Sequence, residues 1–494
     1  MREDRRASRN DQMGGASSAD AREGRRIRGP SLAIVNGKVW SRPGLTAVTV
    51  EGDRIAEVLT GKPAAHRVID AGGAAILPAF NDAHVHFLMG SRSLGELDLH
   101  GIQTQEEIER RVTVHARDHH EPWVVGRGWL YSAFPGGMPT VELLDRLVPD
   151  RPAYLESFDA HTGWANSRAL AIGGIAERSV LKEAAMERVT RHLPARTRER
   201  DLGALRAGMR LAASRGIASI QEAGDGQNQL DLWNALRESG GLTLRVRLAF
   251  DLTPQTDVER CGPATAGDHW ISTGILKAFA DGVVESRTAA MLDPYAGSDE
   301  RGTPVWELDE LAAAVRATDR RGWQVQVHAI GDAAIRMALD AFEGTTPGRR
   351  HRVEHVETPD PSDLPRFANL GVIASMQPQH SKPPLTEVWR RTLGPERASR
   401  GWPWRELLAS GARLAFGTDW PVVPLDPLAS IAAASDVGRH DAIRAWTSGG
   451  AYAEHADPEK GEVREGMLAD LAVVDLEDSI VRATIVGGRV VYMA

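Results

Sequence analysis

Two patterns of hydrophobic and polar residues divide the chain. Near both ends, apolar and polar residues alternate in short runs, in residues 32–59 and again in residues 470–492. Alternation with a period of two is typical of half-buried antiparallel strands. Neither end carries enough strands to form a stable sheet by itself. We therefore predict one small composite β-sandwich built from residues 31–73 and 457–494, with the rest of the chain inserted between them.

Between these ends, short apolar runs alternate with segments of helical period, such as Trp306–Arg321 and Asp332–Glu343. This alternation indicates parallel βα units. Eight runs have the length of buried strands: Ala74–Phe80, Ile217–Gln221, Leu244–Asp251, Gly274–Asp281, Gln324–His328, Arg352–His355, Ile373–Gln377 and Leu414–Gly417. They predict an α/β fold with a (β/α)8 TIM barrel over residues 74–456. An open doubly wound sheet is the alternative, although no Gly-x-Gly-x-x-Gly turn follows the first strand.

A long stretch, about 88–215, separates the first two predicted strands and exceeds any single loop. It contains an aromatic, Gly- and Pro-rich tract at Trp123–Thr140 and the segment AHTGWANSRAL at Ala160–Leu170. We interpret it as an insertion that forms a lid or cap over the barrel. Residues 1–30 are rich in Arg, Asp, Ser and Gly and poor in large apolar residues, which predicts a disordered tail.

Composition narrows the classes of function. The 494 residues carry a net charge of −8 and one cysteine, Cys261. A negative net charge does not indicate the basic surface that binds nucleic acid. A single cysteine excludes both an internal disulfide and a zinc site built from cysteines. No run of about 18 apolar residues predicts a membrane span, and the first residues lack the apolar core of a secretory signal. We expect a cytoplasmic protein that acts on a small molecule; a homodimer is left open.

Potential metal ligands lie on or just past five of the predicted strands. They are His84, His86, Lys277, His328, His355 and Asp419. Side chains alternate along an extended chain, so His84 and His86 point to the same side. The carboxyl ends of barrel strands meet at one face. Each residue alone has an ordinary structural explanation, such as a helix cap for Asp419. Their joint placement predicts a site for a divalent metal, because imidazole binds zinc, iron, nickel and copper.

The chain resembles the amidohydrolase superfamily, and within it the amidohydrolase 3 group of YtcJ-like proteins and N-substituted formamide deformylases. The matching stretches are LPAFNDAHVHF, GWANSRAL, GIASIQEAG, LKAFADGVVESRTAAMLDPY, VHAIGDAA, HRVEH, SMQPQH, FGTDWPV and GEVREGMLADLAVVD. They cover nearly the whole chain after the tail. The resemblance implies a β-sandwich joined to a distorted TIM barrel, which agrees with the pattern of strands and helices.

The same resemblance implies a metal-dependent hydrolase of non-peptide C–N bonds, such as amides or formamides. It assigns His84, His86 and Asp419 to one metal and His328 and His355 to another. A carbamylated Lys277 would bridge the two. Zinc is the expected metal, with one or two ions per chain and with manganese or iron as alternatives.

We expect the metal to activate a water molecule. Asp419 is the predicted general base and acid, and Lys277, His328 and His355 complete the predicted catalytic set. His328 and His355 would stabilise the oxyanion if only one metal binds.

Further residues are candidates for binding the substrate. They are Arg287, Thr288, Trp129, His161, Trp164, Gln377, His380 and Trp420. Two departures from the family pattern bear on specificity. Glu285 stands where the family usually has a small residue, which favours a basic or neutral substrate. The segment after Leu170 is shorter than is usual, which leaves the shape of the lid open.

Two other functions remain alternatives. The same site could hydrolyse an ester, a lactone or a phosphoester, because a fold does not fix a substrate. The chain could instead be a catalytically silent binding or regulatory protein, although every metal-ligand position of the family pattern is intact.

Overall fold

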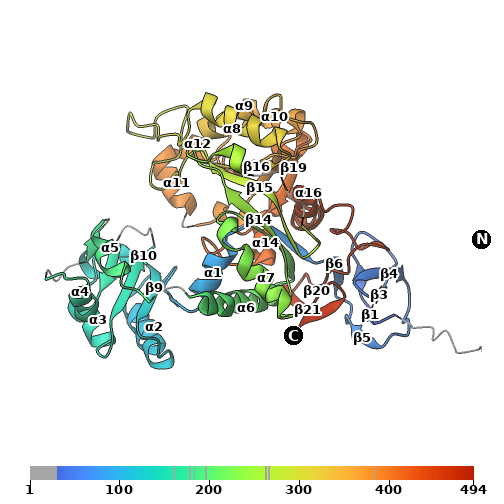
Figure 1. The fold of residues 1–494 in the computed structure, drawn as a ribbon, viewed down its shortest axis with the longest axis horizontal. Helices are drawn as coiled ribbons and strands as arrows, with labels where there is room; N and C mark the ends of the chain where they lie inside the picture. Colours follow the sequence, from blue (N-terminus) through green and yellow to red (C-terminus); the bar gives the residue numbers. More distant parts are fainter. Residues whose placement is uncertain are drawn as a thin grey trace, which may run out of the picture.

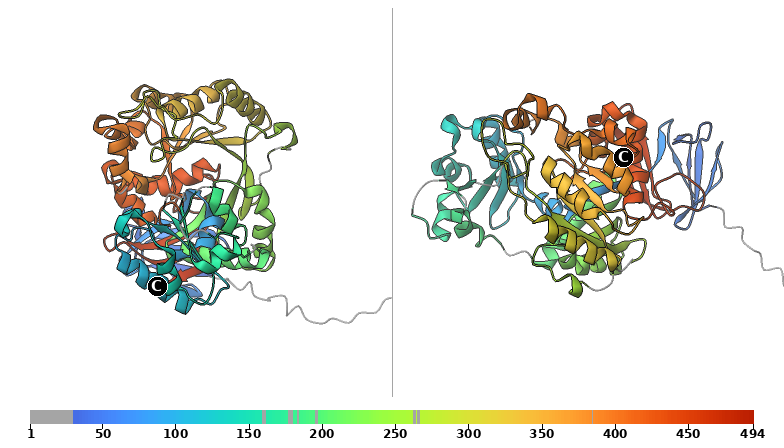
Figure 2. Two further views of the ribbon diagram at one scale, coloured as in Figure 1. Left: turned by 90° about the vertical axis from the view of Figure 1, so that its left-hand side faces the viewer. Right: turned by 90° about the horizontal axis from the view of Figure 1, so that it is seen from above.

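The computed structural model describes residues 30–494 except 159–161, 177–179, 183, 195, 196, 262, 263, 265, 266 and 384. Three parts lie in a row, with an inserted α/β unit on the left, a barrel in the middle and a β-sandwich on the right (Figure 1). The view from above keeps this order (Figure 2). Among the helices of the described residues, none is both long and apolar enough to cross a membrane.

The central sheet has eight strands, and every neighbouring pair is parallel. In spatial order they are β7 (Phe80–Val85), β13 (Ile217–Glu222), β14 (Arg245–Asp251), β15 (Ile271–Phe279), β16 (Gln324–Ala329), β17 (Arg352–His355), β18 (Ile373–Met376) and β19 (Arg413–Phe416). The chain after β19 returns to β7, where the Asp419 amide donates to the His84 carbonyl at 2.7 Å. The predicted TIM barrel is thereby confirmed.

Helices cover the outside of the barrel. They are α6 (Arg198–Ser214), α7 (Leu230–Glu238), α8 (Leu308–Arg320), α9 (Asp332–Phe342), α10 (Leu364–Leu370), α11 (Leu385–Leu393), α12 (Pro395–Ala398), α13 (Trp404–Ala409), α14 (Pro427–Ala433), α15 (Arg439–Arg444) and α16 (Gly450–Ala453). In α9 the buried residues Ala334, Ile335, Ala338, Leu339 and Phe342 recur at helical spacing. This apolar stripe is what holds an amphipathic helix against a sheet. Both helices predicted from sequence end within two residues of their expected limits.

The first predicted strand, Ala74–Phe80, is wrong in its assignment. Its apolar residues form β6 (Ala75–Pro78), which pairs with the sandwich strands β2 (Lys38–Val39) and β20 (Leu471–Asp475). The barrel strand β7 starts only at Phe80. Pro78 has no amide hydrogen with which to continue a strand ladder. After Pro78 the chain passes from the sandwich sheet to the barrel sheet, so one apolar run contributes residues to both cores.

The β-sandwich is built from both ends of the chain, as predicted. One sheet has the order β4-β3-β1-β5 and the other β2-β6-β20-β21-β22. The bounds not yet given are β1 (Leu32–Val35), β3 (Ala47–Glu51), β4 (Arg54–Leu59), β5 (Arg67–Asp70), β21 (Ile480–Val486) and β22 (Arg489–Met493). Ile34, Val48, Ile76, Leu471 and Ile485 share one buried core between the sheets. Strands from both ends of the chain are therefore needed to form this core.

The insertion after β7 is a folded unit with its own sheet, of order β12-β11-β10-β9-β8. Its strands are β8 (Leu97–Asp98), β9 (Val124–Trp129), β10 (Ala153–Ser157), β11 (Thr162–Ala165) and β12 (Leu181–Lys182), and its helices are α2 (Gln105–Asp118), α3 (Val141–Leu147), α4 (Ser167–Ile172) and α5 (Ala184–Thr190). The preceding helix α1 (Phe87–Ser93) packs against α6 of the barrel. The insertion is therefore a small α/β domain rather than a simple flap.

Candidate metal centre

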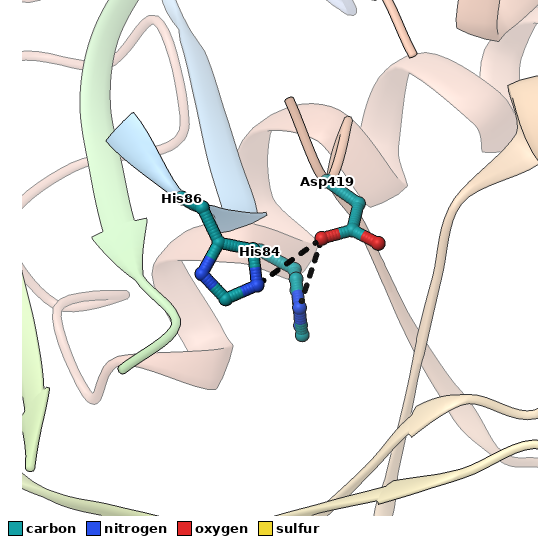
Figure 3. A group of neighbouring side chains, drawn as sticks. All are labelled: His84, His86 and Asp419. Atoms are coloured by element: carbon teal, nitrogen blue, oxygen red, sulfur yellow. Dashed lines mark ion pairs between the residues drawn. The ribbon is translucent and has the colours of Figure 1, made fainter. Parts of the chain in front are cut away.

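The carboxyl end of β7 brings two imidazoles to one carboxylate. His84 is buried, and His86 follows directly after the strand. The Nε2 atoms of both residues lie 3.5 Å from the same oxygen, Oδ1 of Asp419 (Figure 3). One possible ligand atom from each of these three residues lies within 4.8 Å of the others, so together they could hold a metal ion. The convergence predicted from the His-x-His spacing is present.

Asp419 lies in the turn after β19 with a left-handed backbone, φ 60°. Burial disfavours the charged carboxylate, yet the imidazoles of His84, His355 and His86 lower the pKa of Asp419 well below its ordinary value. Its Oδ1 is buried without a hydrogen-bond donor among the described residues. A charged, buried oxygen that faces imidazole nitrogens fits a divalent cation, which takes these ligand types.

The orientation of His84 depends on Glu354, which sequence reasoning missed. The Nδ1 of His84 lies 2.5 Å from Glu354 Oε2, and Arg352 Nε lies 2.8 Å from Glu354 Oε1. Burial alone would raise the pKa of Glu354, but Arg352 and His84 bring it down to about 2. The carboxylate therefore accepts a hydrogen bond from the Nδ1–H group and leaves the Nε2 lone pair of His84 facing Asp419. Arg352 and Glu354 alternate along β17, a spacing that could have revealed them.

Lys277 is buried in β15, with its Nζ 3.4 Å from His84 Nε2. Burial lowers the pKa of this amine to about 8, and the nearby Glu354 and Asp419 only partly oppose the shift. A larger fraction of neutral amine is available at this lysine than at an exposed one.

His328 and His355 complete the cluster at the ends of β16 and β17. Their ring centroids are 4.4 Å apart, and the ring of His355 lies 4.8 Å from that of His84. Burial lowers the pKa of His328 to about 3 and that of His355 well below its ordinary value. Both imidazoles are neutral at pH 7, which is the form that binds a metal. The structure thus gathers all six predicted metal-site residues at one end of the barrel.

Two predicted substrate residues lie within this cluster. Oε1 of Gln377 is 2.8 Å from His355 Nδ1, and Nδ1 of His380 is 2.9 Å from Oε1 of Glu357. Gln377 thereby fixes the ring of His355. Glu357 was not predicted, because a single acidic residue after a strand gives no distinctive pattern.

Three others lie at the rim. The Trp420 ring packs edge-on against Phe87 of α1 at 5.6 Å. Thr288 Oγ1 accepts from the Val283 amide at 3.0 Å and so holds its own loop together. The exposed Arg287 side chain lies 3.7 Å from Glu300. In these positions, Trp420 and Thr288 shape the rim through protein contacts.

The remaining predictions concern the insertion. Trp129 and Trp164 are fully buried in its core, where their indoles donate to the carbonyls of Leu155 and Thr140 at 2.9 and 2.8 Å. The structure therefore corrects their assignment as walls of the pocket, because the insertion needs these rings for a core of its own. His161 lies outside the described residues.

A cavity of about 870 Å³ lies between the insertion and the carboxyl ends of the first barrel strands. His86 and Phe279 line it from the barrel, and Tyr154 lines it from the insertion. Its charged lining residues are Glu96, Glu156, Glu222, Asp225, Asp251, Arg92 and Arg127. Carboxylates outnumber guanidinium groups, so the cavity suits neutral or basic molecules better than acidic ones.

Comparison with known proteins places this architecture in a family. The model of the Amidohydrolase family matches residues 67–492. The chain belongs to the amidohydrolase family. It is 28% identical to the protein LONG AFTER FAR-RED 3 of Arabidopsis thaliana over 86% of this chain and 83% of that protein. The YtcJ protein of Bacillus subtilis (strain 168) is 26% identical, over 86% of this chain and 90% of its own length.

The chain is also similar to a further curated protein and to a solved structure. An N-substituted formamide deformylase of Arthrobacter pascens is 23% identical over 87% of this chain and 90% of its own. The crystal structure of an uncharacterized metal-dependent hydrolase from Pyrococcus furiosus shares 25% identity. It superposes with a TM-score of 0.73 over 90% of this chain and 99% of that one.

Proposed function

We propose that this chain is a metal-dependent amidohydrolase that cleaves a non-peptide C–N bond, of the amide or formamide type, in a small molecule. The observation that carries the proposal is the buried Asp419 carboxylate, whose Oδ1 faces the Nε2 atoms of His84 and His86 at 3.5 Å. No donor among the described residues satisfies that oxygen. Such a group is stable when a cation completes it.

The residues that would hold a metal are His84, His86 and Asp419, with His328, His355 and Lys277 beside them. Imidazole and carboxylate ligands make zinc our first choice, with manganese or iron as alternatives. When bound, the metal polarises the scissile carbonyl and lowers the pKa of water to about 7.

Lys277 is proposed to be carbamylated. Its neutral amine adds to the carbon of CO2 with loss of one proton, which converts a buried cation into a carboxylate-like anion. The low pKa of Lys277, about 8 because of burial, supports the step, since only the neutral amine reacts. A cationic amine beside His84 has no lone pair for a metal, whereas the carbamate offers two anionic oxygens.

Asp419 is the proposed proton carrier. It accepts a proton from water as the water oxygen bonds to the carbonyl carbon, and it delivers that proton to the nitrogen as the C–N bond breaks. The amine therefore leaves neutral. The pKa of Asp419 is well below its ordinary value, so the carboxylate is ionised at pH 7, which is the form that a general base requires.

Two observations support the substrate class. One relative is named an N-substituted formamide deformylase, which acts on a C–N bond outside peptides. The cavity beside His86 has more carboxylates than guanidinium groups. We accordingly propose a neutral or basic N-substituted formamide or N-acyl amine as substrate.

The test uses the full chain, stripped with a chelator and reloaded with Zn²⁺. It is assayed against N-substituted formamides, N-acyl amines, carboxylic esters, phosphoesters and an Xaa-Pro dipeptide. Turnover of the first two classes that requires Zn²⁺ is expected. Exclusive ester or phosphoester turnover would replace the proposed bond type, and metal binding without any turnover would favour a binding protein.

A further inference from the structure

A second group of buried metal-ligand types lies beside Asp419. It consists of His355, Glu357 and His380, which are all buried and lie at or after the ends of β17 and β18. One possible ligand atom from each residue lies within 4.8 Å of the others. The family resemblance assigns no metal role to Glu357 or His380, so this group needs its own explanation.

The ring of His380 is held by one nitrogen and free at the other. Its Nδ1 lies 2.9 Å from Oε1 of Glu357, and a carboxylate can only accept in that contact. Nδ1 therefore carries a proton in the neutral imidazole, and the lone pair is on Nε2. Nε2 is buried and has no hydrogen-bond partner among the described residues.

His355 is held in the same way. Its Nδ1 donates to Oε1 of Gln377 at 2.8 Å, which leaves the lone pair on its Nε2. His84 repeats the arrangement with Glu354 at 2.5 Å. An acceptor on Nδ1 that turns Nε2 inward is the arrangement seen around histidines that bind metals. His84, His355 and His380 therefore share this arrangement.

The distance from His380 Nε2 to Oδ2 of Asp419 is 3.8 Å, too long for a hydrogen bond. Two ligands that each lie about 2.0–2.1 Å from one tetrahedral ion are roughly 3.3 Å apart. The atoms around Oδ1 are at a similar spacing, 3.5 Å from His84 and His86. Oδ1 of Asp419 thus faces the Nε2 atoms of His84 and His86, and Oδ2 faces that of His380.

We propose that His380 is an additional ligand of the second divalent cation, the one that the family resemblance assigns to His328 and His355. Glu357 orients His380 through Nδ1, and Oδ2 of Asp419 lies 3.8 Å from the Nε2 atom that would bind this ion. The proposal rests on the metal dependence of the proposed function but not on its substrate. It gives the second ion a nitrogen ligand in addition to those that the family resemblance assigns, His328 and His355.

The test measures Zn²⁺ directly. The chelator-stripped full chain is dialysed against buffered Zn²⁺, and bound metal per chain is counted by mass spectrometry. The key variant is His380→Asn, because the asparagine amide can still donate to Glu357 while the Nε2 ligand is lost. We expect two Zn²⁺ in the wild type and one in His380→Asn, with a weakened visible spectrum when Co²⁺ replaces Zn²⁺.

Two more variants complete the design. Glu357→Gln keeps an acceptor for His380 but removes the charge, so affinity for the second ion should fall about 10–100-fold. His351→Asn is the matched control, since His351 is buried at the opposite end of β17, and it should bind two ions. Circular dichroism confirms that each variant is folded.

The outcomes separate the two proposals. Equal Zn²⁺ content and equal affinities in the wild type and in His380→Asn would overturn the role of His380, and would identify it as an imidazolium paired with Glu357. A single Zn²⁺ in the wild type that His380→Asn retains would do the same while leaving the metal-dependent function intact. No bound metal in the wild type would overturn both.

Discussion

The two ends of the barrel bury polar side chains in opposite ways. At the amino end, Arg245 makes two contacts with Asp470, at 2.7 and 3.0 Å, and Lys460 lies 2.7 Å from Glu454 and 2.6 Å from Ser219 Oγ. At the carboxyl end, Oδ1 of Asp419 and Nε2 of His380 are buried without a partner among the described residues.

This difference distinguishes polar groups that stabilise the fold from polar groups that are available for metal binding or catalysis. A buried pair whose charges satisfy each other needs nothing more, and it fixes how the strands and the sandwich fit together. A buried group left unsatisfied by its own protein destabilises the fold unless something else completes it. The comparison therefore predicts that substitutions at the amino end change stability alone, and that those at the carboxyl end change activity and metal binding.

The largest expected effect is at Asp419. Asp419→Asn removes the group that moves the proton, so kcat on an N-substituted formamide should fall about 10²–10⁴-fold at saturating Zn²⁺. Steady-state kinetics with metal analysis measures it. Asp426→Asn is the matched control, because Asp426 caps α14 and asparagine caps equally well. Nearly full turnover in Asp419→Asn would contradict the assignment.

The second prediction concerns the amino end. Arg245→Ala leaves Asp470 as an unpaired buried charge, which should lower the free energy of unfolding by about 3–5 kcal/mol. Urea unfolding measures the loss, and Zn²⁺ content should not change. Arg110→Ala, which breaks the exposed contact with Glu107, serves as a control with no measurable change. A loss of metal in Arg245→Ala would break the proposed division between the two ends.

The third prediction is a dependence on pH. Burial lowers the pKa of His351 to about 4, and its Nδ1 accepts from the Val325 amide. As pH falls from about 6.5 toward 4, the unfolded chain binds a proton that the folded chain does not. The free energy of unfolding should fall by up to about 3 kcal/mol over this window. His351→Gln, which is neutral at every pH, should make this slope shallower in urea unfolding, and the remaining slope comes from His86, His328 and His455, whose pKa values burial also lowers. An unchanged slope would count against the assignment.

The smallest expected effect is at Glu285. Its Oε1 accepts from the Trp389 indole at 3.0 Å, and burial raises its pKa. Glu285→Gln keeps that hydrogen bond and removes the charge. KM for an amine-bearing substrate should rise roughly two- to fivefold, since a partly exposed ion pair contributes about 0.2–1 kcal/mol. A neutral amide of the same size should be unaffected, and an equal change for both would rule out a charge effect.

Sequence patterns predicted the barrel well because each strand is short, apolar and bounded. Arg352–His355 agrees residue for residue, since polar residues mark both ends. The first strand failed for a physical reason. Ala75–Pro78 and Phe80–Val85 are both buried, so hydrophobicity alone cannot show that they belong to different sheets.

The sequence also indicated part of the candidate site. The six predicted metal-site residues are recognisable because they lie on or just past barrel strands, whose carboxyl ends the fold brings together. Glu354 and Glu357 were missed, since their roles arise from contacts with His84 and His380 rather than from position alone. Trp129 and Trp164 were misassigned because a tract rich in aromatic residues has the same pattern in a pocket wall and in a core of its own.

The composite sandwich has a consequence for how the protein is made. Strand β6 has β20 as a neighbour, and Arg482 donates to the Ala71 carbonyl at a sequence separation of 411 residues. On the ribosome, β6 emerges long before its partner and has an open, apolar edge in the meantime. Contacts so distant in sequence form slowly, and unpaired edges invite aggregation. We therefore expect the growing chain to be most prone to aggregation before β20 is made and pairs with β6.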